Sequence, residues 1–172
     1  MIQIDKNDKL YKYLTNLGVE DVDKAYIELA KEGRYNLDDV RQFFRQDYIP
    51  SSTQEIDEKE IEKILDYYID LKSVKTFNST QLKKLLENYK QTGDEQVKEL
   101  IVNSQLKDVL YLCLNYSTLH NNVDLQDLVQ IANIGLLEAI KKYNMNAKID
   151  FKDYIIYYVR KSIKEYEEKT NG

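Results

Sequence analysis

The chain has 172 residues, of which 42% are hydrophobic and 32% are charged; this composition excludes an intrinsically disordered protein and allows at most two small cores. One cysteine and one histidine exclude a disulfide framework and a Cys/His metal site within the chain. The formal net charge of −5 disfavours nucleic-acid binding over the whole surface, and the lack of both a signal-like N-terminus and a run of ~18 apolar residues predicts a cytoplasmic protein without membrane contact.

Acidic residues are concentrated in the first half of the sequence. Residues 1–75 contain 17 acidic and 12 basic residues, whereas residues 76–172 contain 13 of each. Residues 72–78 lack any hydrophobic periodicity, so we expect a boundary between two lobes there. The predicted organisation is an acidic N-terminal helical domain over residues 1–74 and a second domain over residues 75–172.

The first half has the apolar spacing of short helices, which predicts them over residues 9–17, 21–31, 37–45 and 57–71. Gly18 and Gly33 stand where the first two should end, because glycine readily adopts the left-handed conformation that ends a helix. Asn36 is placed to cap the third helix, and Pro50 marks a loop before the fourth.

The second half predicts four longer helices, over residues 79–91, 94 to about 116, 124–143 and 150 to about 168. Ser79 and Asp150 stand where N-caps are needed, and Gly93 should end the first of these helices. A break is expected near Asn103 in the second. Because one proline and five glycines leave few helix breakers, we expect an all-α protein of two small helical lobes.

Sequence motifs of enzymes are absent. There is no phosphate-binding Gly-Lys-Ser/Thr loop, no paired-histidine zinc helix and no glycine-flanked nucleophile, so we expect neither catalysis nor a cofactor. His120, beside two asparagines, is interpreted as a solvated loop residue. Cys113 lies on an apolar helical stripe and is interpreted as a core residue.

The helix predicted over residues 124–143 has a polar pattern of its own. Asp127, Gln130 and Asn133 recur at every third position, while apolar residues at other positions can serve the core, namely Leu128, Ile131, Leu136 and Ala139. Such a helix can bury one side and offer a polar side to a partner. Alternatively, it is a buried helix on which the amides are incidental, and spacing alone favours this second reading.

The last predicted helix combines aromatic and basic residues at helical intervals: Phe151, Tyr154, Tyr157, Tyr158, Arg160, Lys161 and Lys164. Aromatic rings can stack on single-stranded bases for ~1–3 kcal/mol each, and lysine and arginine neutralise phosphates. This pattern is typical of a platform for single-stranded nucleic acid. The alternative is that the tyrosines belong to the core and the lysines only solubilise the outer face.

The run Asp-Leu-Val-Gln-Ile-Ala-Asn-Ile-Gly-Leu at residues 127–136 resembles the Asp-Leu-Ile-Gln-Glu-Gly-Asn-Ile-Gly-Leu run of bacterial primary sigma factors. In that family the helix docks on the coiled coil of the polymerase β′ subunit. The resemblance therefore implies that this contact is made by Asp127, Gln130 and Asn133, with Leu137 nearby. Ile131 and Ala132 depart from the family's Glu-Gly pair and imply a reshaped contact.

The resemblance covers roughly residues 79–166 and includes the aromatic helix, whose spacing from Phe151 to Arg160 is similar to the family's segment that traps the melted −10 promoter strand. It implies that this strand is bound by Phe151, Tyr154, Tyr157, Tyr158, Arg160, Lys161 and Lys164. Two acidic residues depart from the family pattern. Asp150 stands where the family is basic and Asp153 replaces a small hydroxyl residue, and carboxylates repel phosphates.

A fainter similarity, over residues 26–40, is to the acidic N-terminal domain of some primary sigma factors. We therefore expect a sigma-like transcription initiation factor that binds core RNA polymerase and the melted −10 strand. The alternative is a sigma-like interaction protein or split-sigma subunit that docks on polymerase and regulates it without opening DNA. An anti-sigma factor or a second sigma subunit is a further candidate partner, because the −35-reading domains of the family are expected to lie outside this chain. A helical domain with no link to polymerase is the remaining alternative.

Overall fold

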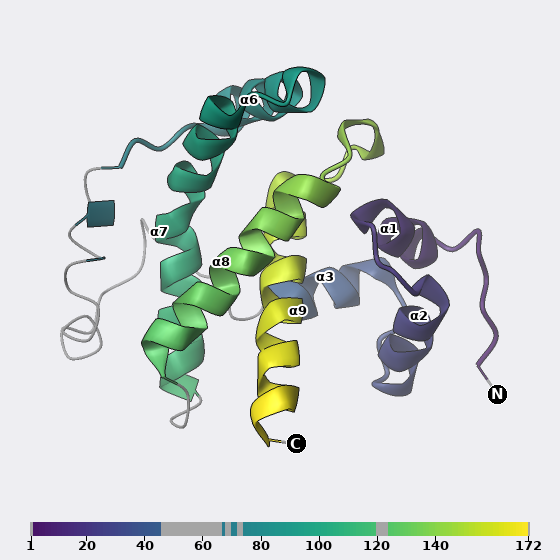
Figure 1. Ribbon diagram of the computed structural model, residues 1–172. Helices are drawn as coiled ribbons and strands as arrows, with labels where there is room; N and C mark the ends of the chain where they lie inside the picture. The colour runs from purple at the N-terminus through teal and green to yellow at the C-terminus, as the bar shows by residue number, and fades with distance from the viewer. Residues whose placement is uncertain (1, 46–66, 68–69, 72–73, 120–123, 172) are drawn as a thin grey trace.

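The computed structural model describes residues 2–45, 67, 70–71, 74–119 and 124–171 (Figure 1). In these residues the regular structure is helical and contains no strand, which confirms the all-α prediction. The proposed loop at Pro50, most of the helix predicted over residues 57–71, and His120 lie outside the described residues. Tyr67, Asp70 and Leu71 are described and are helical.

Three short helices form the N-terminal lobe: α1 (Lys9–Leu17), α2 (Val22–Lys31) and α3 (Leu37–Arg45). Their ends follow local chemistry. Asp8 caps α1 by accepting a 2.9 Å hydrogen bond from the backbone N–H of Leu10, and Asn36 likewise accepts one of 2.9 Å from Asp39. Gly18 ends α1 with φ at 82°, a conformation that favours glycine.

The second lobe contains α6 (Ser79–Thr92), α7 (Glu95–Leu119), α8 (Leu125–Lys142), a 3-10 turn (Met145–Ala147) and α9 (Phe151–Asn171). The expected cap of α6 is corrected. Asn78, not Ser79, is the N-cap, because its side chain and that of Gln81 bond reciprocally to each other's backbone N–H.

The break expected near Asn103 in α7 is also absent, and α7 is continuous. Serine is disfavoured inside helices because its hydroxyl competes for the hydrogen bonds of nearby backbone groups. Here the Ser104 hydroxyl is buried and donates a 2.7 Å hydrogen bond to the Ile101 carbonyl within the helix. The hydroxyl is thereby satisfied without ending the helix.

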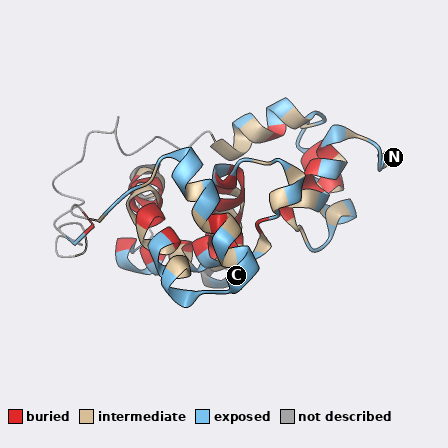
Figure 2. Cartoon of the chain, turned by 90° about the horizontal axis from the view of Figure 1, so that it is seen from above, coloured by how far each residue is buried: buried red, intermediate tan, exposed pale blue. Residues whose placement is uncertain are grey.

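The helices α8 and α9 cross at close range in the centre of the second lobe, and α7 packs against α8 (Figures 1 and 2). Gly135 lies at the crossing. A Cβ atom there would lie 2.6 Å from the Tyr158 carbonyl oxygen and 2.7 Å from the Val159 Cα. Because both neighbours are backbone atoms, only glycine permits this approach of the two helices.

The two lobes share one hydrophobic cluster. Leu10, Leu14 and Leu17 of α1 are buried in the same cluster as Tyr154 and Tyr158 of α9, and α3 also packs against α9. The N-terminal helices thus lie on the helix that the sequence assigned to nucleic acid. No helix in the part of the chain that the structure describes is long and apolar enough to span a membrane.

The close contact at Gly135 predicts that adding one methyl group there destabilises the fold. Gly135→Ala should lower the free energy of unfolding by about 2–3 kcal/mol, because the backbones of α8 and α9 must separate. Gly93→Ala is a comparison without crowding: Gly93, unlike the helical Gly135, has a left-handed φ of 67° and open space around it, so backbone strain alone should cost about 1–2 kcal/mol. Urea denaturation measures both. Equal losses for the two variants would contradict the close crossing.

Candidate functional site

One side of α8 carries an exposed stripe of mixed character. Asp127 and Gln130 are exposed, as the polar pattern predicted. Ile134 and Leu137, which follow at helical spacing on the same side, are 59% and 44% exposed. We call Asp127, Gln130, Ile134 and Leu137 the α8 stripe. Sequence reasoning missed Ile134, although its position four residues after Gln130 places it between two residues that were selected.

Asn133 lies at the edge of the α8 stripe and is half-buried. Its side-chain amide nitrogen lies 3.4 Å from the Tyr67 hydroxyl, and its amide oxygen is buried without a hydrogen-bond partner among the described residues. A buried amide of this kind is held less firmly than a fully bonded one. In this arrangement the Asn133 amide therefore lies against Tyr67 and is only partly open to solvent.

The opposite side of α8 belongs to the core. Leu128, Leu136 and Ala139 are fully buried, as predicted, and Ile131 is half-buried. Ala132 is also fully buried. The side chain of Ala132 therefore does not reach the surface, and its effect on a partner contact stays a prediction.

Three of the aromatic residues assigned to nucleic acid are buried: Phe151, Tyr154 and Tyr158 are at most 5% exposed. The rings of Phe151 and Tyr154 pack edge-on against Tyr143, with centroids 5.4 and 5.2 Å apart. The Tyr154 hydroxyl donates a 2.9 Å hydrogen bond to the Asn16 carbonyl, and the Tyr158 hydroxyl donates one to the Leu17 carbonyl. Because α1 and α8 cover these rings, they offer no face to a base in this arrangement.

Tyr157 is half-buried where α9 packs against α3. Its ring meets Phe44 of α3 edge-on at 5.5 Å and Tyr158 at 4.9 Å. Burial, followed by the charges of Glu165, Glu20 and Glu28, raises the pKa of Tyr157 to about 12. Its hydroxyl therefore stays protonated at neutral pH, with three glutamates near it.

Asp153 connects α9 to α3. Its side chain is 3% exposed and accepts hydrogen bonds from Arg41 Nε at 3.1 Å and from Arg45 Nε at 3.0 Å. The sequence placed this carboxylate where it would repel promoter phosphates. That expectation is corrected for the described arrangement, because Asp153 points into the lobe interface and is paired with two guanidinium groups.

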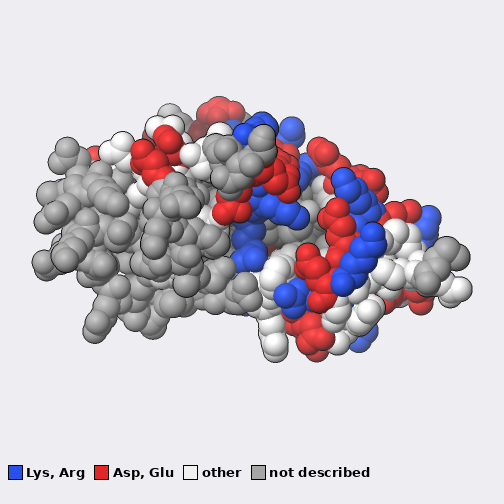
Figure 3. Space-filling view, turned by 90° about the horizontal axis from the view of Figure 1, so that it is seen from below, with Lys and Arg blue, Asp and Glu red and all other residues white. Residues whose placement is uncertain are grey.

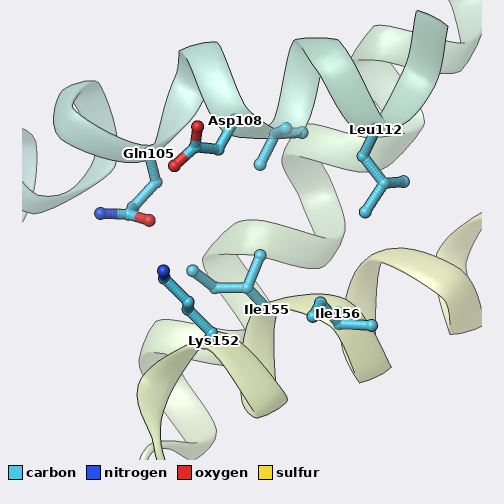
Figure 4. A pocket seen from close by; sticks show the side chains of 7 residues that line it. Gln105, Asp108, Leu112, Lys152, Ile155 and Ile156 are labelled. Carbon is cyan, nitrogen blue, oxygen red and sulfur yellow. The ribbon is translucent and has the colours of Figure 1, made fainter. Parts of the chain in front are cut away.

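The basic residues of α9 do not form one uniform strip. Arg160 lies over the Phe43 ring at 4.9 Å, and Lys161 lies 4.0 Å from the Glu165 carboxylate. Lys164 is exposed. All three line a groove between the lobes, whereas Lys152 points toward Gln105 of α7 (Figure 4).

The cavity at Lys152 is too small to bind a ligand. It lies between α7 and α9, has a volume of about 10 Å³ and is walled by Leu112, Ile155 and Ile156 beside Gln105 and Asp108 (Figure 4). Such a volume holds one water at most. In the described part of the chain, no group of three or more histidine, cysteine or acidic residues could hold a metal ion. Cys113 is fully buried, and burial raises the pKa of its thiol, so the thiol stays protonated.

The part of the chain that carries these features matches a known family. Residues 101–171, which include α8 and α9, match the family model of Sigma-70 region 2. The match covers less than half of the chain, and within it the sequence is similar to Sigma-70 region 2. Sigma factors are a non-enzymatic family, in agreement with the lack of a catalytic motif in this sequence.

Curated relatives extend the similarity beyond region 2. The chain is 23% identical over 167 residues to the RNA polymerase sigma factor SigA of Mycoplasma genitalium, which covers 94% of the chain and 29% of the relative. SigA of Mycoplasma pneumoniae is 23% identical over 164 residues, covering 92% and 28%. The sigma-G factor of Bacillus subtilis is 24% identical over 103 residues, covering 60% and 39%. The chain thus spans less than two fifths of the length of these relatives.

The contact between Asp153 of α9 and the arginines of α3 should contribute to the free energy of unfolding. Asp153→Ala should lower the free energy of unfolding by about 1–3 kcal/mol, less than the 3–5 typical of a fully buried pair, because the side chains of Arg41 and Arg45 are 40% and 37% exposed. Adding Arg41→Ala and Arg45→Ala should cost less than the sum of the separate losses, since all three changes break one contact. Urea denaturation measures this. Lys152→Ala, at an exposed neighbour, should change stability by no more than about 0.5 kcal/mol, and a similar value for Asp153→Ala would refute the contact.

Proposed function

We propose that the chain is a sigma-like transcription initiation factor that binds core RNA polymerase and engages the melted −10 promoter strand. The observation that carries the proposal is the α8 stripe, an exposed mixed surface on a helix of the Sigma-70 region 2 segment. The three relatives described above are named as RNA polymerase sigma factors, which supports the proposed role in transcription initiation.

The α8 stripe is the proposed contact with the coiled coil of the polymerase β′ subunit. Ile134 and Leu137 are large apolar side chains exposed to solvent, and Asp127 and Gln130 lie beside them on the same side of the helix. Protein interfaces commonly place apolar anchors at the centre and polar groups around them. Asn133 joins this contact once Tyr67 has left its amide.

The proposed promoter contact requires the N-terminal lobe to leave α9. Arg160, Lys161 and Lys164 supply positive charge for phosphates, and Tyr157 is the aromatic residue nearest the surface. Phe151, Tyr154 and Tyr158 reach bases only after α1 and α3 have moved, because α1 accepts hydrogen bonds from the two tyrosines and α3 holds Asp153. The described arrangement is then a closed form, with α1 and α3 over the proposed nucleic-acid helix.

The burial of these rings also favours a second candidate function. A sigma-like interaction protein or split-sigma subunit could keep the N-terminal lobe in place, dock through the α8 stripe and regulate polymerase without opening DNA. In that case the tyrosines of α9 serve only the core, as their burial in the described arrangement allows. The two functions share the docking step and differ in DNA binding.

Docking is tested by the affinity of the purified chain for core polymerase. Gln130→Ala with Asn133→Ala, and separately Ile134→Ala with Leu137→Ala, should each raise Kd at least tenfold, which corresponds to about 1.4 kcal/mol of lost contact. Lys83→Ala, at an exposed position on α6, is the control and should leave Kd unchanged. Biolayer interferometry with immobilised polymerase measures Kd. Full affinity in both double variants would rule out the α8 stripe as the docking surface.

DNA engagement is tested with a labelled single-stranded −10 oligonucleotide and the complex of polymerase with the chain. Arg41→Ala with Arg45→Ala should increase oligonucleotide affinity several-fold, because it removes the contact that holds α3 on α9. Tyr157→Ala in the same background should reduce it again. If the chain does not strengthen oligonucleotide binding to polymerase and Tyr157→Ala changes nothing, the regulatory alternative is the correct one.

A further inference from the structure

A groove separates the N-terminal lobe from the C-terminal half of α9. It has a volume of about 760 Å³, and α2 and α3 form one wall while α9 forms the other. Figure 3 views this face from below, where acidic and basic side chains gather around a hollow in the surface. We call it the interlobe groove. No residue of α8 lines it, so it is separate from the α8 stripe.

The groove contains aromatic and aliphatic side chains from three helices: Phe43 and Phe44 of α3, Leu112 and Tyr116 of α7, and Tyr157 and Ile163 of α9. The Phe43 ring already has two guanidinium groups near it, Arg34 at 3.7 Å and Arg160 at 4.9 Å from its centroid. Aromatic faces attract cations in this way. These walls can therefore receive both apolar side chains and positive charge.

The charged residues that line the interlobe groove are mainly acidic. Seven carboxylates face four cations: Glu20, Asp21, Glu28, Glu32, Glu165, Glu167 and Glu168 against Lys24, Arg160, Lys161 and Lys164. The groove therefore has a formal excess of three negative charges. Phosphates are repelled by such a surface, which makes a nucleic acid an unfavourable occupant while the lobes are together.

Part of this negative charge is left without a cationic partner. Glu20, just before α2, and Glu28 of α2 form no ion pair within the described residues, and both act on Tyr157 across the groove. On the opposite wall, burial and the charge of Glu168 raise the pKa of Glu167. The wall that carries Glu20 and Glu28 would gain stability from an added positive charge.

We propose that the interlobe groove binds a basic amphipathic helix of a partner protein. A helix laid between α2 and α9 places its apolar face on the aromatic side chains and its lysine or arginine residues beside the carboxylates. The volume admits the side chains of one helical face and is within the usual range of binding pockets. A second copy of this chain, with its formal net charge of −5, fits less well. This proposal goes beyond polymerase docking and does not depend on it.

The experiment measures fluorescence anisotropy of labelled peptides of about 18 residues with the full chain. An amphipathic leucine–lysine helix should bind at least tenfold more tightly than a scrambled peptide of the same composition, and a leucine–glutamate helix should not bind. Glu20→Gln with Glu28→Gln should raise Kd about five- to tenfold. Glu95→Gln with Glu99→Gln removes the same charge from exposed positions of α7 outside the groove and should change Kd less than twofold.

Four results would overturn the proposal. The first is equal affinity for the amphipathic and scrambled peptides, and the second is an equal effect of the two glutamine pairs, which would indicate attraction to net charge alone. The third is tighter binding of a single-stranded oligonucleotide than of the basic peptide. The fourth is loss of peptide binding in Gln130→Ala with Leu137→Ala, which would place the peptide on the α8 stripe. Circular dichroism confirms that each variant remains helical.

Discussion

A carboxylate taken out of water needs positive partners, and in this chain those partners come from the other lobe. Asp153 on α9 is paired with Arg41 and Arg45, more than one hundred residues earlier in the sequence. This pairing sets α3 on α9, brings Phe44 onto Tyr157, and forms the interlobe groove beside it. The burial of the α9 aromatic residues and the acidic lining of the groove both depend on this arrangement of the two lobes.

Helix ends could be predicted from sequence because they are decided locally. Asn36, Gly18 and Gly93 act within a few residues of their own positions, and the structure places them where capping chemistry predicts. The cap of α6 shifted by one residue because two neighbouring residues, Asn78 and Ser79, can both serve as caps, and only the reciprocal bond with Gln81 distinguishes them.

The candidate site was only partly predictable. The polar spacing on α8 identified Asp127 and Gln130 because exposure follows helical periodicity, whereas the aromatic spacing on α9 fits a core and a stacking platform equally well. What decides between these readings is the cover provided by α1 and α3, and its key contact joins residues far apart in the chain. No local pattern in the sequence pairs Asp153 with Arg41.

Gly135 gives the second lobe a mechanical property. Since the α8 and α9 backbones touch at this residue, α8 cannot roll or slide on α9 without a steric clash. The N-terminal helices are attached to this pair both by polar contacts of Asp153 and by apolar packing of α1 on α9, so the close α8–α9 crossing is the fixed base on which they rest.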